Sequence, residues 1–259
     1  MKIVASIQAR MKSTRLPGKV LMPLGGKPML LFQIERLKQC RLMDEVMVAT
    51  STNPADDAIA DLCIQNDIRC FRGSEDDVLG RVCQAVMSAA ADIHVECFGD
   101  SPFVDPDLID EMIATITNTT SAIDIVTNCH KSTFPAGMEA YIYRADCLRQ
   151  IHERVAADDP LREHCGFNLL RHRDQFSVIE VEAPPNKHFP ELCLEVDEQS
   201  DLDTLQGIDA YFRAQNMPYY RLDDLIALSE REPDLFTGNQ HVHRRWKEVR
   251  GNHVGVPKG

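Results

Sequence analysis

The sequence predicts an α/β protein with a doubly wound, mostly parallel sheet. Short apolar runs of about four to six residues alternate with helical segments of about 12 residues along the first half of the chain. Such apolar runs are typical of parallel strands that are covered by helices on both faces. Polar loops follow several of these runs, and open α/β sheets bind their ligands along the edge where the strands end.

Predicted strands and helices alternate regularly up to residue 143. Strands are expected over residues 3–7, 46–50, 68–71, 93–98, 123–127 and 139–143, and helices over 54–66, 74–90 and 106–118. Pro54 and Pro106 open two of the helices, where proline is tolerated. Asp56 and Asp57 lie in a first helical turn, where the helix dipole favours acids. Ser74 is the predicted N-cap of the middle helix.

The second half is less regular, and no linker divides it from the first. Helices are expected over 145–156, 160–173, 201–216 and 222–230, and strands over 177–182 and 192–196. We therefore expect one domain over 1–236, in which a small insertion at 128–195 serves dimerisation. The tail 237–259 is polar and basic, and it is either a frayed terminus or an arm that docks on a partner subunit.

Composition excludes several classes of protein. The chain has 259 residues, 44% of them hydrophobic, which suffices for a full core. Its formal charge of −12 argues against a nucleic-acid partner. The nine scattered cysteines form no C-x-x-C pair and are typical of reduced thiols rather than of a disulfide framework or zinc site. No secretory signal or membrane-spanning run is recognisable, so we expect a cytoplasmic protein.

A cationic loop follows the first predicted strand. Arg10, Lys12, Arg15 and Lys19 lie within ten residues of an otherwise acidic chain. Like charges this close repel one another unless an anion lies among them, so the loop predicts a polyphosphate site, with a merely solvated basic loop as the alternative. The hydroxyls of Ser13 and Thr14 and the close approach allowed by Gly18 fit the same prediction, although no Walker A or dinucleotide fingerprint is present.

Two aspartates follow predicted strands at the same sheet edge. Asp100 ends the strand 93–98, and Asp197 ends the strand 192–196. Mg²⁺ is commonly held by one or two carboxylates together with phosphates and waters, so the pair predicts a magnesium site. The alternatives are a turn-forming role for Asp100 and a helix-start role for Asp197, although Ser200 or Asp201 is the better N-cap candidate.

Glu75-Asp76-Asp77 also has the look of a metal motif, but it fits an acidic first helical turn better. Among the nine histidines, which form no catalytic or metal-binding arrangement, only His164 is kept as a candidate.

These residues together resemble the SpsF-like branch of the acylneuraminate and KDO cytidylyltransferases. The resemblance covers most of residues 1–230 and is strongest at 7–19, 48–53, 71–81 and 99–102. It implies a Rossmann-like fold of the nucleotide-diphospho-sugar transferase type, Mg²⁺ as cofactor and a homodimer. It also implies the reaction CTP + sugar → CMP-sugar + pyrophosphate with an acidic, nonulosonate- or KDO-like sugar, for surface polysaccharide or glycan biosynthesis.

The resemblance also implies roles for single residues. Nucleotide binding is expected at Gln8, Ala9, Arg10, Lys12, Ser13, Arg15, Lys19, Ser51, Arg72 and Arg81. Of these, Arg10, Arg15 and Lys19 are expected to be catalytic together with Asp100, and Asp100 and Asp197 to hold Mg²⁺. The sugar side is expected at Pro135, Gly137, Glu139 and His164. Lys12 stands where the branch usually has glycine, and the segment around Ala136 departs from the branch, so the acceptor is not transferred.

Two other functions stay open at this point. A metal-dependent glycosyltransferase could use the same half of the sheet, with Asp100 or the pair Asp76 and Asp77 at the diphosphate of a nucleotide sugar. A non-catalytic subunit that binds a sugar nucleotide is the third alternative. Retention of both strand-end aspartates and all four loop cations argues against that third alternative.

Overall fold

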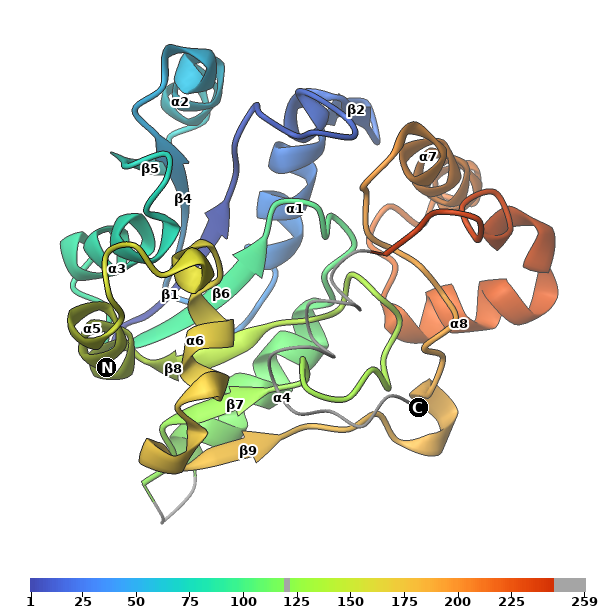
Figure 1. Ribbon diagram of the computed structural model, residues 1–259. Coiled ribbons are helices and arrows are strands. Elements are labelled where there is room, and N and C mark those ends of the chain that lie inside the picture. The colour runs from blue at the N-terminus through green and yellow to red at the C-terminus, as the bar shows by residue number, and fades with distance from the viewer. Residues whose placement is uncertain (119–121, 245–259) are drawn as a thin grey trace.

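Seven strands form one sheet in the order β5-β4-β1-β6-β8-β7-β9 (Figure 1). The computed structural model describes residues 1–118 and 122–244. The strands are β1 (Ile3–Gln8), β4 (Glu45–Ser51), β5 (Arg69–Gly73), β6 (Ile93–Phe98), β7 (Ile125–Thr127), β8 (Tyr141–Arg144) and β9 (Val178–Glu180). Neighbouring strands are parallel except where β8 pairs with β6 and β7. The predicted mostly parallel sheet is confirmed.

The chain winds away from β1 in both directions. β4 and then β5 extend the sheet on one side, whereas β6 joins β1 on the other. The end of β1 is therefore a topological switch point, which is where open α/β sheets bind ligands. The cationic loop begins at this point.

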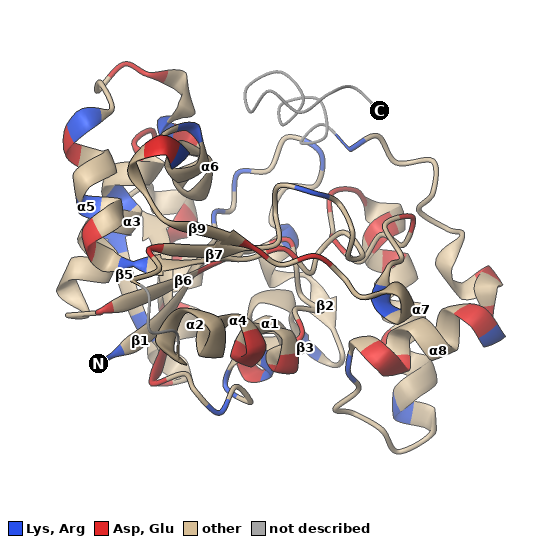
Figure 2. Ribbon diagram, turned by 90° about the horizontal axis from the view of Figure 1, so that it is seen from below, with Lys and Arg blue, Asp and Glu red and all other residues tan. Residues whose placement is uncertain are grey.

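Helices cover both faces of the sheet, as a doubly wound fold requires. One hydrophobic cluster takes up α1 (Met29–Leu37), α2 (Asp57–Gln65), α4 (Pro106–Asn118), α7 (Gln199–Ala214) and α8 (Leu222–Arg231). A second takes up α3 (Val78–Ser88), α5 (Ala145–Arg154) and α6 (Cys165–Arg171). Successive residues of β1 serve the two clusters in turn: Ile3 packs into the first and Val4 into the second. Figure 2 shows α5 and α6 on one side of the sheet and α1, α2 and α4 on the other.

The structure differs from the prediction in some local features. The apolar helix α1 and the hairpin of β2 (Pro23–Leu24) and β3 (Lys27–Pro28) were not predicted. The predicted strand 192–196 is not a strand; only an isolated bridge joins Cys193 to Ala136. The helix expected over 160–173 divides into a 3₁₀ turn, Pro160–Glu163, and α6.

The N-cap predicted at Ser74 is also wrong. The side chain of Asp77 caps α3 by accepting from the backbone N–H of Gly80 at 2.8 Å. Ser74 instead caps the preceding turn, since its Oγ accepts from the N–H of Asp77 at 3.0 Å. Aspartate and serine are both strong N-caps, and the prediction chose the serine three residues before the true cap.

Residues 128–195 continue the main sheet, because they supply β8, α5, α6 and β9. Their predicted part in dimerisation stays a prediction. In the basic tail, the residues up to Arg244 are described, and Asn239, His243 and Arg244 bond to the body of the same chain, so the frayed alternative is wrong for them. Residues 245–259 lie outside the described part. Within the described residues, no helix is long and apolar enough to span a membrane.

Candidate active site

Lys19 lies between Asp100 and Asp197 at the switch point. Its ammonium is 3.4 Å from Oδ2 of Asp100 and 3.3 Å from Oδ1 of Asp197, and it donates to the carbonyl of Val196 at 2.6 Å. The Lys19 side chain is only 12% exposed. Two carboxylates that share one buried ammonium define a single small, polar volume at the end of β1.

The turn that carries Asp100 is pressed against β1. The N–H of Gly99 donates to the carbonyl of Gln8 at 3.1 Å, and the carbonyl of Asp100 accepts from Val196 at 2.7 Å. A Cβ added at Gly99 would lie 2.5 Å from that Gln8 oxygen. Only glycine therefore allows this approach, which links the ends of β1 and β6 to the segment that leads to Asp197.

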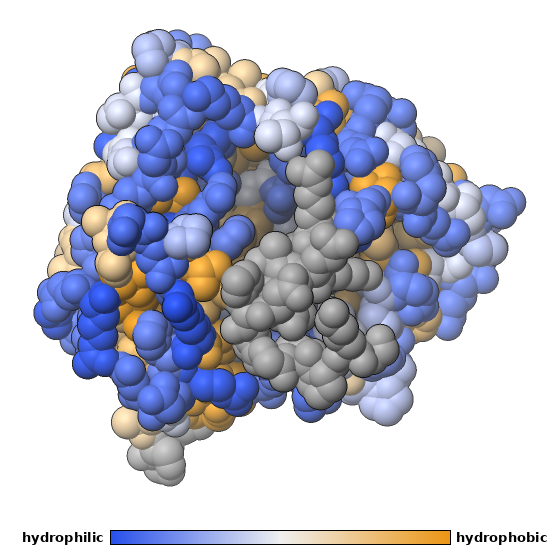
Figure 3. Space-filling view, viewed as in Figure 1, coloured by the Kyte–Doolittle hydropathy of each residue, from blue (hydrophilic) through white to orange (hydrophobic). Residues whose placement is uncertain are grey.

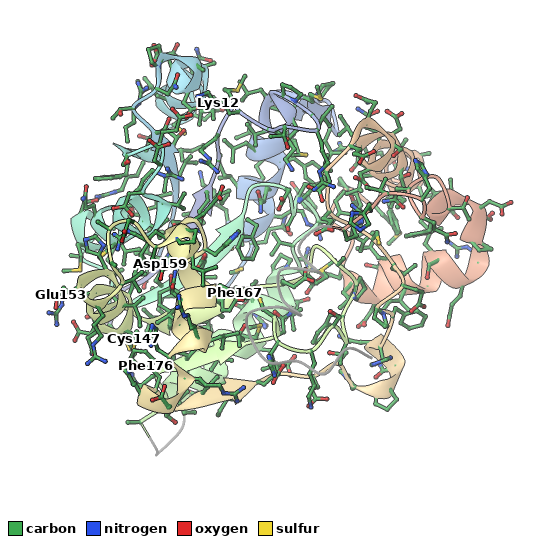
Figure 4. All side chains as sticks on the ribbon, in the orientation of Figure 1. Lys12, Cys147, Glu153, Asp159, Phe167 and Phe176 are labelled. Carbon is green, nitrogen blue, oxygen red and sulfur yellow. The ribbon has the colours of Figure 1, made fainter. Side chains whose placement is uncertain are left out.

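The four loop cations separate into two groups. Nη2 of Arg15 is 2.6 Å from Oδ2 of Asp197, so Arg15 and Lys19 meet at one carboxylate. Arg10 pairs instead with Glu163 at 3.1 Å, and Lys12 pairs with Glu75 at 2.7 Å. Figure 4 labels Lys12 beyond the end of the sheet, near α2 and β2. The hydrogen bond with Glu75 raises the pKa of Lys12.

Asp56 holds the backbone of the cationic loop, although the sequence predicted only that it lies in a first helical turn. Oδ1 of Asp56 accepts from the N–H of Met11 at 2.7 Å, and its Oδ2 accepts from the N–H and Oγ of Ser51. Gly18 closes the loop with a left-handed φ of 72°, and its N–H donates to the Met11 carbonyl at 2.8 Å. The role of Asp56 could have been suspected from its position. It follows the end of β4 by a few residues and comes three residues after Asn53, at the sheet edge where the cationic loop also begins.

The remaining nucleotide-binding candidates line or support this edge. Arg81 is buried and donates to the carbonyls of Ser74 and Glu75, so it shapes the turn before α3. Arg72 donates to the carbonyls of Ser51 and Asn53 at 3.0 and 3.1 Å. Ala9 follows β1 and donates to Ala49, and Ser13 Oγ accepts from Leu16 within the loop.

The side chain of Gln8 is held by the buried acid Glu96 on the neighbouring strand β6. Its Nε2 donates to Oε1 of Glu96 at 2.8 Å, and the hydroxyl of Tyr143 donates to Oε2 at 3.0 Å. Burial raises the pKa of Glu96 to about 7, even though these two hydrogen bonds and one from the backbone of Gly166 favour the ionised form. This network was not predicted, because Glu96 lies inside an apolar strand.

The predicted sugar-side segment lies beside the one that leads to Asp197. Ala136 exchanges backbone hydrogen bonds with Leu192 and Leu194, at 2.9 and 2.7 Å. Gly137 has a φ of 96°, and an added Cβ would lie 2.6 Å from the Leu194 carbonyl. The carboxylate of Glu139 accepts from the N–H of Gly137 at 2.6 Å, so it stabilises this turn. Pro135 closes it, since its carbonyl accepts from Met138.

His164 lies next to the second cation group. It directly follows Glu163, the partner of Arg10, and occupies the N-cap position of α6. Its ring lies 6.2 Å from that of Phe167, measured between centroids. The part of His164 in binding the sugar stays a prediction.

Asp77 forms an ion pair with Arg162. Nε and Nη2 of Arg162 each lie 2.9 Å from one of its oxygens. Burial raises the pKa of Asp77, but hydrogen bonds from Arg162 and Gly80 outweigh that and lower it. No group of three or more His, Cys, Asp or Glu side chains among residues 1–118 and 122–244 could hold a metal by itself. Asp100 and Asp197 fit Mg²⁺ better, since that ion takes its other ligands from phosphates and water.

The face that carries these loops is hollowed near its centre and rimmed mainly by hydrophilic residues (Figure 3). A separate cavity of about 550 Å³ lies at the amino ends of β4 and β5, lined by residues that include Asp44 and Arg69. It opens at the other edge of the sheet from the switch point, so it is not part of the site.

Comparison with known proteins agrees with this geometry. Residues 4–246 match the family model described as cytidylyltransferase. The chain belongs to the cytidylyltransferase family. It is therefore a nucleotidyltransferase enzyme, and the fold expected from the resemblance is confirmed.

Three relatives of this cytidylyltransferase cover most of its length. The spore coat polysaccharide biosynthesis protein SpsF of Bacillus subtilis is 33% identical over 239 residues, which are 91% of this chain and 97% of that protein. A 3-deoxy-manno-octulosonate cytidylyltransferase of Bdellovibrio bacteriovorus is 34% identical over 207 residues, covering 71% of this chain and 79% of that one. A solved cytidylyltransferase structure from Leptospira borgpetersenii superposes with a TM-score of 0.85 at 30% identity, covering 94% of this chain and 100% of its own.

Proposed function

We propose that this enzyme is a Mg²⁺-dependent cytidylyltransferase that activates an acidic, nonulosonate- or KDO-like sugar for surface polysaccharide or glycan biosynthesis. The reaction is CTP + sugar → CMP-sugar + pyrophosphate. The observation that carries the proposal is the position of Lys19 between Asp100 and Asp197, beside Arg15 and at the switch point of the sheet. The names of the relatives support a cytidine nucleotide and a saccharide product.

Transfer of a nucleotidyl group asks for positioning and charge neutralisation rather than for covalent catalysis. A sugar hydroxyl attacks the α-phosphorus of CTP, the bond from that phosphorus to the bridging oxygen breaks, and pyrophosphate leaves. Lys19 and Arg15 lie where their cations can turn from the Asp197 carboxylate to the phosphate oxygens and stabilise charge that develops on pyrophosphate.

Asp100 and Asp197 would hold Mg²⁺, which supplies positive charge to the phosphates and lowers the pKa of the attacking hydroxyl. Arg10 and Lys12 form the second cationic group and would bind the nucleotide on the side of Glu75. The segment 135–139 borders the strand-like stretch before Asp197, so we assign the acceptor sugar to that side.

Both oxygens of Asp77 bind the guanidinium of Arg162, which is outside the loop of candidate phosphate-binding cations, whereas Asp197 pairs with Arg15 and Lys19 of that loop. This difference disfavours the site at Asp76 and Asp77 in the glycosyltransferase alternative. The structure contains one chain, so a homodimer through residues 128–195 stays a prediction that sedimentation velocity would test.

Pyrophosphate release is the decisive assay. CTP, UTP, ATP and GTP are each offered with Mg²⁺ against a panel of acidic and amino sugars, and release is expected with CTP and one acidic sugar. Release with another nucleotide would overturn the base assignment, and release of UDP or GDP from a nucleotide sugar would establish the glycosyltransferase. Absence of both turnover and Mg²⁺-dependent nucleotide binding would overturn the proposed function.

A further inference from the structure

The described end of the tail is bonded into the candidate active site. Nδ2 of Asn239 donates to the carbonyl of Cys193 at 3.0 Å and to Oδ1 of Asp201 at 2.9 Å. Nη1 of Arg15, a phosphate-binding candidate, donates to the carbonyl of His243 at 2.9 Å. Arg244 then enters the protein, and its side chain is only 4% exposed.

Arg244 lies among three carboxylates on the segment from Glu195 to Asp201. Its two terminal nitrogens bind the two oxygens of Asp201, at 3.2 and 2.6 Å. The same guanidinium lies 3.5 Å from Glu195 and 3.8 Å from Asp197. Paired, two-point contact of this kind fixes orientation as well as charge, because the guanidinium fork matches a carboxylate.

Asp201 links Arg244 to the backbone of Asp197, because its carboxylate bonds to both. Its Oδ2 accepts from the N–H of Asp197 and from the N–H of Glu198, each at 2.9 Å. Asp201 is fully buried, so its charge needs a permanent partner. A continuous set of contacts therefore runs from Arg244 through Asp201 to the turn that presents the Asp197 carboxylate to Lys19.

We propose that Arg244 is a positioning residue for nucleotidyl transfer, which holds the turn 195–201 so that Asp197 faces the nucleotide phosphates and their cation. The inference rests on the proposed function for its catalytic consequence. In that function Lys19 and Arg15 turn toward the phosphates, and Arg244 remains as the counter-charge of the buried acids. Without it, the carboxylates of Glu195, Asp197 and Asp201 repel one another, and the turn opens.

The test compares Arg244→Gln with a variant of another arginine that pairs with a buried aspartate of α7. Arg213 pairs with Asp209 at 2.6 Å outside the site and is 38% exposed, so Arg213→Gln removes an arginine–aspartate pair of the same helix without touching residues 195–201. Both are made in the full chain and checked for folding by circular dichroism. Hydrogen exchange is measured without ligands on the peptide that covers 195–201, and pyrophosphate release is measured against CTP and Mg²⁺ concentration.

We expect Arg244→Gln to exchange at 195–201 at least tenfold faster and to lose at least tenfold in kcat. Its KM for CTP should stay within threefold, because Arg10 and Lys12 are untouched. Arg244→Lys should recover part of both losses, and Arg213→Gln should show neither. Unchanged exchange and kcat in a folded Arg244→Gln, or equal losses in Arg213→Gln, would overturn the proposal.

A second variant covers the case in which Arg244→Gln does not fold. Asp201→Asn/Arg244→Gln removes the buried charge at Asp201 together with its partner, and we expect it to fold with a lowered kcat and faster exchange at 195–201. Wild-type values in both measurements would contradict the positioning role. If the wild-type enzyme releases no pyrophosphate with any sugar, the proposed function fails, whereas the exchange comparison still decides whether Arg244 holds the turn.

Discussion

Lys19 and Asp197 are 178 residues apart in the sequence, yet the ammonium of one lies 3.3 Å from a carboxylate oxygen of the other. Asp100, which follows a different strand, shares the same ammonium. Two carboxylates from distant parts of the chain thus meet one cation at the switch point of the sheet. That convergence places a lysine ammonium directly beside two carboxylates, the ligand type that Mg²⁺ prefers.

Replacing Asp100 by asparagine removes one of these ligands but keeps the shape of the side chain. We expect Asp100→Asn to remain folded and to lose about 100-fold or more in kcat, since charge stabilisation in the transition state is lost. Pyrophosphate release across a Mg²⁺ titration is the measurement. The control Asp107→Asn alters an exposed acid that pairs with Arg221. Full Mg²⁺-dependent turnover in Asp100→Asn would refute the metal assignment.

Asp56 holds the cationic loop through the N–H of Met11, so its loss should act on nucleotide affinity. For Asp56→Ala we expect the Kd for CTP, measured by calorimetry with Mg²⁺, to rise about tenfold, which corresponds to about 1.4 kcal/mol. Asp61→Ala, at an exposed position of α2, is the control. A change of less than twofold for Asp56→Ala would show that the loop does not need this contact.

Alanine substitutions at two glycines should have opposite effects on stability, because only one of the two positions lacks room for a Cβ. A Cβ at Gly99 meets the backbone of Gln8, so Gly99→Ala should lower the free energy of unfolding by about 1–3 kcal/mol. Gly207 lies in α7, and an added Cβ would meet nothing within 4 Å beyond its own stretch of helix, so Gly207→Ala should raise the free energy of unfolding by about 0.5–1 kcal/mol. Urea unfolding of both variants measures the difference. Equal effects of the two substitutions would contradict the close contact at Gly99.

Glu96 makes stability depend on pH. Burial raises its pKa from 4.5 to about 7, so the folded state keeps a proton that the unfolded chain loses. Its stabilising contribution is complete below pH 4.5 and is lost as pH rises through 7. Relative to wild type, Glu96→Gln should therefore gain stability between pH 5 and 8, by an amount on the order of 3 kcal/mol.

His94, on the same strand, acts in the opposite sense. Burial lowers its pKa to about 3, so its contribution is lost as pH falls below 6.5. Urea unfolding at pH 5, 6, 7 and 8 compares wild type, Glu96→Gln and Glu111→Gln, the last at an exposed position of α4. The wild-type curve should be flattened between pH 4.5 and 6.5, where the two effects oppose. A Glu96→Gln effect that is the same at every pH would contradict the raised pKa.

The sequence was sufficient to predict the parallel sheet and the meeting of Lys19, Asp100 and Asp197. The sheet and the place of Asp100 follow from one rule, that residues at the ends of parallel strands gather at one edge. Asp197 reaches the same place, although the strand predicted before it does not form. The catalytic and metal-binding roles of these residues stay predictions.

Contacts between side chains that are far apart in the sequence could not be predicted from that rule. Nothing in the sequence pairs Arg244 with Asp201, 43 residues away, because an ion pair leaves no periodic signal. Asp56 was placed correctly in a helix start, but its carboxylate turns back to another loop. Residues 192–196 have the composition of a strand, yet Gly137 brings them against an irregular segment instead of against the sheet.

The single reversed strand has a consequence for how such an enzyme can diversify. Because β8 is antiparallel to β6, Tyr141 at its beginning pairs with Glu96 near the end of β6. The segment that enters β8, residues 135–140, therefore reaches the same edge as the loops that leave β1 and β6. Selectivity encoded there can change by substitution or insertion without shifting the register of β1 against β4 or β6. In the proposed function, the reversal would divide one sheet edge into a constant half for the nucleotide and an exchangeable half for the sugar.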